Sequence, residues 1–161
     1  MDQTHIHLII THLPIFGSLI GGLVLIHGIW TKSNQTLIAG YNVLILSAIG
    51  ASIAYITGEG AEETVEHLPG FTKNVIEEHQ ESAEAAIIAM VILGVFALAG
   101  VFFTVNQSPL TRNAAIITAF VTLVCFGIVS WTGYLGGKIR HTEIATTLTP
   151  KGTPPKLKHD D

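Results

Sequence analysis

The sequence predicts an all-α protein: an integral membrane four-helix bundle, with both termini on the same side and helices 2–4 extended beyond the membrane on that side. Two observations support this prediction. Of the 161 residues, 48% are hydrophobic and only 12% are charged, against roughly 25% charged in a typical soluble domain. Four stretches contain no Asp, Glu, Lys or Arg, and each exceeds the roughly 20 residues that cross a bilayer. They are 3–31, 33–58, 85–111 and 113–137.

These stretches define the membrane spans. The four spans are placed at about 6–30, 36–57, 85–105 and 113–135. Each is predicted to be a helix, because hydrocarbon offers backbone groups no hydrogen-bond partner except each other. The spans form one domain over residues 1–146, and the Pro- and Lys-rich segment 147–161 is predicted to be a flexible tail. We therefore expect a multi-pass protein of the cell's inner membrane, in contact with the lipid bilayer.

Charge is distributed unevenly between the two sides. Four spans put both termini and the loop 59–84 on one side, which we call side A, and only two short turns on the other, side B. All twelve acidic residues and seven of the eight histidines fall on side A, whereas the only charges on side B are Lys32 and Arg112. We therefore expect the chemistry near side A. The net charge of −4 argues against a nucleic-acid partner, and the Lys and Arg counts near the spans leave the orientation open.

Small residues recur at helical spacing within the spans. Gly17 and Gly21 form a GxxxG motif, and Gly50, Ala54 and Gly58 repeat every four residues in the second span. Contacts within one bundle are the favoured interpretation, and a homodimer interface is the alternative.

The two halves of the chain resemble a weak tandem repeat. The second span ends Ile56-Thr57-Gly58 and the fourth ends Trp131-Thr132-Gly133. In each half a histidine follows the threonine after nine or ten residues. Two hairpins in the same orientation would give the bundle an approximate two-fold axis along the membrane normal.

Four histidines fall in one layer at side A. Histidine is costly in a membrane and usually marks a functional site. His7, His12, His79 and His141 come from three helices. His12 lies about four residues inside the side A boundary, His7 lies near it, and His79 and His141 each lie about 9 Å outside it at 1.5 Å per residue. If the first helix runs through Pro14 with a kink, His7 and His12 point about 140° apart at 3.6 residues per turn. Only one of them then faces the core, and depth in the membrane favours His12.

Two of these histidines have space beside them. His79 and His141 each project along a stripe of small residues. The stripes are Ser82, Ala83 and Ala86 for the first, and Gly133 and Gly137 for the second. A flat macrocycle ligated from a helix needs that clearance and a bare ion does not, which favours heme. Three glutamates lie near enough in sequence to accept from the ligating rings: Glu62, Glu63 and Glu78.

The segment His7-Leu8-Ile9-Ile10-Thr11-His12-Leu13-Pro14 resembles the HPxxxHFP opening of a family of small, four-span bacterial membrane proteins catalogued as a domain of unknown function. In that family a Gly-acidic stretch closes span 2, a histidine opens span 3, and a GGxLVYxH-like element closes span 4. The counterparts here are Gly58–Glu62, His79 and Gly136–His141. Leu8, Leu13 and Arg140 depart from the family pattern. The resemblance implies the architecture and a histidine set, with heme suspected and no reaction assigned.

Three functions compete. In the first, His79 with His12 or His141 ligates one b-type heme, and the protein transfers electrons between a quinone or a redox partner protein and side A. In the second, His7, His12, His79 and His141 with Glu62 hold a non-heme Zn, Fe or Cu ion. The third is a cofactor-free membrane scaffold. A hydrolytic enzyme is disfavoured, because no nucleophile with a base partner and no phosphate loop is visible.

Overall fold

The computed structural model describes residues 3–66 and 73–140, and in these ranges it is all-α with no strand. The helices are α1 (Gln3–Ile10), α2 (His12–Thr31), α3 (Asn34–Glu66), α4 (Lys73–Val105) and α5 (Thr111–Arg140). The predicted first span corresponds to α1 and α2 together, and the other three spans correspond to α3, α4 and α5. The predicted tail, 147–161, lies outside the described residues.

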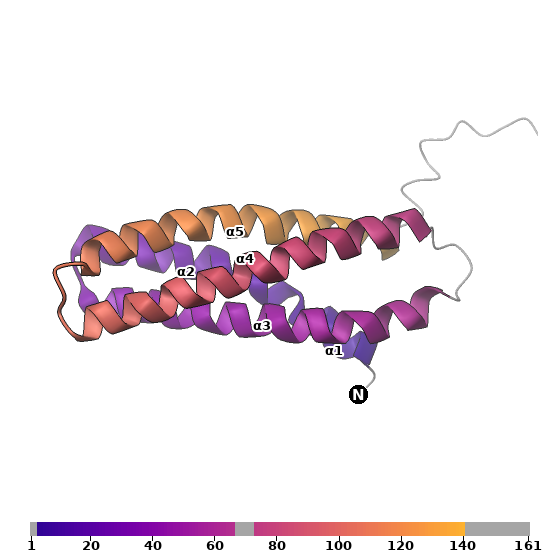
Figure 1. Cartoon of the computed structure of the whole chain (residues 1–161), viewed down its shortest axis with the longest axis horizontal. Coiled ribbons are helices and arrows are strands. Elements are labelled where there is room, and N and C mark those ends of the chain that lie inside the picture. The colour runs from indigo at the N-terminus through magenta and orange to yellow at the C-terminus, as the bar shows by residue number, and fades with distance from the viewer. Residues whose placement is uncertain (1–2, 67–72, 141–161) are drawn as a thin grey trace, which may run out of the picture.

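The long helices form an up-and-down bundle (Figure 1). Helix α2 packs on α3, α3 on α4, α4 on α5, and α5 closes the ring against α2. The short α1 packs mainly on α3, at the end of the bundle where α3 finishes and α4 begins. The start of α1 and the end of α5 lie at this same end, which corresponds to side A (Figure 1). The turns between α2 and α3 and between α4 and α5 form the opposite end, side B.

Four units of the bundle are long and apolar enough to cross a membrane: α1 together with α2, and α3, α4 and α5. Helices α3 and α4 have 33 residues each and α5 has 30, so they measure about 50 and 45 Å at 1.5 Å per residue. A bilayer's hydrocarbon core is only about 30 Å thick, so these helices extend past it, as predicted. Large apolar side chains face outward: Phe102, Phe120 and Leu123 are 64%, 68% and 68% exposed. Such an apolar outer surface is compatible with contact with lipid.

The GxxxG motif lies inside the bundle. A Cβ atom added at Gly21 would fall 2.6 Å from Leu44 Cδ2, and one at Gly17 would fall 2.8 Å from Ser47 Oγ. Both glycines are buried, so the motif brings α2 and α3 together within one chain. This supports the favoured interpretation of the motif.

Pro14 divides the first helix. Because proline has no N–H, the carbonyl of Ile10 loses its helical donor, and the helix is interrupted at Thr11. The Thr11 N–H still donates to the His7 carbonyl at 3.0 Å, so the chain bends there and does not unwind. From α3, the Ser47 hydroxyl donates to the Pro14 carbonyl at 3.1 Å. The bend lets α1 lie against α3, as the kink prediction allowed.

Candidate functional site

His7 contacts α3 at side A. Its Nδ1 lies 2.8 Å from the Ala54 carbonyl oxygen. A carbonyl only accepts, so His7 Nδ1–H must be the donor, and the neutral ring then carries its lone pair on Nε2. The ring is half-buried, and a Cβ atom added at Gly58 would fall 3.4 Å from its Cε1. One turn of α3 therefore supplies both the acceptor and the space beside the ring.

His79 is held between α4 and α5 in the same way as His7 is held on α3. Its Nδ1–H donates to the Thr132 carbonyl oxygen at 3.2 Å, and the ring is half-buried. A Cβ atom added at Gly136 would fall 3.0 Å from its Cε1. This ring, too, has its neutral lone pair on Nε2. Within the described part of the chain, Nε2 of neither His7 nor His79 has a hydrogen-bond partner.

The two histidine contacts repeat in the two hairpins. In each hairpin the ring binds the carbonyl of one residue and sits beside a glycine four residues later: Ala54 and Gly58 in α3, Thr132 and Gly136 in α5. Both pairs are related by an offset of 78 residues. The sequence comparison paired Thr57 with Thr132 instead, which is an offset of 75. The structure therefore displays a local repeat, in a register three residues away from the predicted one.

A hydroxyl pair fixes the carbonyl that holds His79. Ser82 Oγ and Thr132 Oγ1 lie 2.7 Å apart, and the Thr132 hydroxyl is within 3.1 Å of the carbonyl oxygens of Ser82 and Ile128. Ser82 lies one turn after His79 on α4. These contacts tie α4 to α5 beside the ring, so the position of the Thr132 carbonyl is set by both helices.

Loss of this hydroxyl pair is expected to destabilise the folded protein. Thr132→Val should lower the free energy of unfolding by about 1 kcal/mol, the usual size of an interhelical hydrogen bond. Thr122→Val is the matched control, because the Thr122 hydroxyl donates only within its own helix, to the Thr118 carbonyl at 2.7 Å. The measurement is unfolding by sodium dodecyl sulfate, followed by circular dichroism. Equal losses for the two variants would contradict the assigned role of Thr132.

The rings of His7 and His79 both lie at side A. They come from helices diagonal in the bundle, since α1 continues α2 and α4 lies opposite α2. His7 is in α1, and His79 lies within the first two turns of α4.

The other predicted residues are placed differently. His12 is exposed, its Nδ1–H donates to the Leu8 carbonyl of the same helical turn at 3.1 Å, and its ring stacks on Phe16. The structure thus turns His7, and not His12, toward a neighbouring helix. His141 lies outside the described residues, and so does the side chain of Glu62.

The hydrogen-bond acceptors of the two histidines differ from those that the sequence predicted. The Nδ1–H groups of His7 and His79 donate to backbone carbonyls and not to glutamate side chains. A sequence motif cannot indicate such an acceptor, because every residue has a backbone carbonyl. Among the side chains that the structure describes, no three or more His, Cys, Asp or Glu residues converge on a metal site.

Comparison of the chain with protein-family models, with curated proteins and with solved structures finds no match.

Proposed function

We propose that the protein is a membrane b-type cytochrome, with one heme at side A ligated by Nε2 of His7 and Nε2 of His79. The supporting observation is the pair of half-buried imidazoles from diagonal helices, each with its Nδ1–H donated to a carbonyl and with no hydrogen bond from Nε2 to any residue that the structure describes. An acceptor for the Nδ1–H of a ligating histidine fixes the tautomer and orientation of its ring. A bis-imidazole heme, when bound, exchanges single electrons at its iron.

The number of available ligands supports heme over a bare ion. Structural zinc sites take four protein ligands and catalytic sites three, and no such group is present among the described side chains. A porphyrin supplies four of the six iron ligands itself, so two histidines suffice. A non-heme site would need His141 and Glu62 to complete it.

Small residues let both rings pack closely on the neighbouring helices. A Cβ atom added at Gly58 would fall 3.4 Å from Cε1 of His7, and one at Gly136 would fall 3.0 Å from Cε1 of His79. The carbonyls of Ala54 and Thr132 accept from the Nδ1–H groups and so hold the rings in this position. Fixed rings with a free Nε2 lone pair are what a pair of heme ligands requires.

The charge at side A indicates the kind of redox partner. The described glutamates at this end are exposed to solvent: Glu59, Glu77, Glu78, Glu81 and Glu84. Such a surface steers partners with basic patches toward the site and repels acidic ones. We propose electron exchange with a quinone in the bilayer on one hand and a basic redox protein at side A on the other.

A cofactor assay on purified protein tests the proposal. The protein should be expressed with ample heme, and its content measured by the pyridine hemochromogen and by elemental analysis. We expect one heme and one iron per chain, and the same content in Glu62→Ala. Zn, Cu or Fe without heme, lost on Glu62→Ala, would support the non-heme site instead. Absence of both heme and metal would leave the scaffold.

A further inference from the structure

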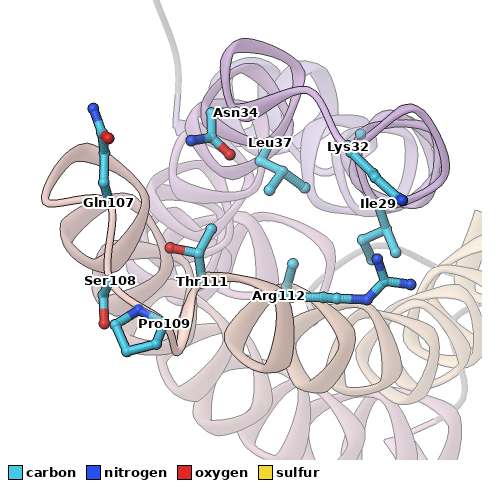
Figure 2. Close-up of a pocket in the computed structure, with 11 residues that line it drawn as sticks. Ile29, Lys32, Asn34, Leu37, Gln107, Ser108, Pro109, Thr111 and Arg112 are labelled. Atoms are coloured by element: carbon cyan, nitrogen blue, oxygen red, sulfur yellow. The ribbon is translucent and has the colours of Figure 1, made fainter.

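A cavity lies at side B, far from the histidine site. It has a volume of about 310 Å³ and lies between the α2–α3 turn and the α4–α5 turn (Figure 2). Its walls are mixed: apolar at Ile29, Leu37 and Pro109, and polar at residues such as Asn34 and Thr111. The volume is at the lower end of the range typical of small-molecule sites.

Two isolated cations line this one cavity. Lys32 is the only charged residue between positions 3 and 58, and Arg112 is the only one between 85 and 137. Although 80 residues apart in sequence, both line the cavity, and Figure 2 shows them on the same side of it, with Ile29 between them. No acidic residue occurs in either stretch, so nothing in these turns neutralises the two charges. The cavity is therefore electropositive.

Two backbone features also lie at the cavity: the N-termini of two helices and two residues with positive φ. The N-termini of α3 and α5 both lie at the cavity, and helix N-termini favour anions. The structure describes two non-glycine residues with positive φ, Lys32 at 54° and Gln107 at 49°, and both line the cavity. Glycine is the residue that ordinarily occupies such a helix C-terminus. Lysine thus occupies a position where glycine would relieve strain.

The position of the cavity indicates the source of an anion. It lies at the end of the apolar spans, beside Trp30, which is 81% exposed. Exposed tryptophan at the end of a span marks the headgroup level of a bilayer. A ligand there meets two cations together with the apolar side chains of Ile29 and Leu37. This pattern matches a phosphodiester with an apolar tail.

We propose that this cavity binds the phosphate headgroup of an acidic phospholipid, with Lys32 and Arg112 as the recognition residues. A quinone has no charge for these residues to neutralise, and a zwitterionic headgroup brings its own cation. The inference is independent of the heme proposal, because the two sites lie at opposite ends of the bundle.

Native mass spectrometry in dodecyl maltoside tests this assignment. Dioleoylphosphatidylglycerol and dioleoylphosphatidylcholine should be offered to the full chain in equal amounts. We expect the wild-type protein to retain dioleoylphosphatidylglycerol in preference to dioleoylphosphatidylcholine. Lys32→Gly and Arg112→Gln should each weaken the binding of dioleoylphosphatidylglycerol about fivefold. Lys138→Gln, which removes a cation at side A, is the matched control and should leave retention unchanged.

The variants are chosen so that misfolding cannot imitate loss of binding. Lys32→Gly relieves the positive φ, so helicity by circular dichroism should be retained while binding falls. Competition by inorganic phosphate at concentrations comparable to the lipid would support the anion site and assign it to a soluble phosphate. Equal retention of both lipids, or unchanged retention in both side B variants, would overturn the proposal.

Discussion

His79→Ala is expected to abolish the retention of heme through purification. The substitution removes the proposed Nε2 ligand and the Nδ1–H that donates to the Thr132 carbonyl. Removing only an outer partner of a metal ligand typically costs about 10- to 100-fold in affinity, and removing the ligand itself should cost more. His7→Ala should have the same effect, because each of the two variants leaves the iron with a single protein ligand. The measurement is heme per chain together with the oxidised spectrum.

Two histidines serve as controls for this experiment. His12 is exposed, with its ring hydrogen-bonded to the carbonyl of Leu8, four residues earlier in the chain, and His27 lies near side B and contacts Trp30. His12→Ala and His27→Ala should both retain heme with an unchanged spectrum. If His12→Ala loses heme while His7→Ala keeps it, the pairing proposed from the structure is incorrect and His12 is the ligand.

Gly100→Ala is expected to be the most damaging single-methyl change in the bundle core. Tyr41 is fully buried, and a Cβ atom at Gly100 would overlap carbons of its ring. The added methyl must displace an aromatic ring or separate α3 from α4. Overpacking of this kind costs about 1–3 kcal/mol. Unfolding by sodium dodecyl sulfate should show the loss directly.

Gly127→Ala is the matched control, because it adds the same atom to another glycine of a span. No atom lies within 4 Å of a Cβ at Gly127, and the residue is exposed. The free energy of unfolding should stay unchanged or rise by up to about 1 kcal/mol, since alanine favours the helix. Equal effects at Gly100 and Gly127 would contradict the packing of Tyr41 against α4.

The fold was predictable because a lipid bilayer restricts which backbone structures can cross it. A bilayer permits only helices of sufficient length, so stretches without charge located the four spans directly. Pro14 indicated an irregularity in the first helix, and the interruption falls at Thr11, three residues earlier. The direction of the bend was not predictable, because it depends on how α1 packs against α3 and on Ser47, a contact 33 residues away in sequence.

The site was predictable only as a layer of histidines. The histidine count located side A, but depth alone favoured His12 where the structure turns His7 toward α3. The carbonyls of Ala54 and Thr132 that fix the rings belong to the backbone, which leaves no residue signature. The cavity at side B depends on two distant turns meeting, and the sequence marked it only through the isolation of Lys32 and Arg112.

The central claim is that His7 and His79 hold one heme. The most direct test is an absorption spectrum of the wild-type protein, purified in mild detergent after expression with ample heme, first oxidised and then reduced with dithionite. A Soret band with sharp α and β bands on reduction is the predicted result, because two imidazoles hold the iron low-spin. A spectrum without a Soret band would contradict the claim.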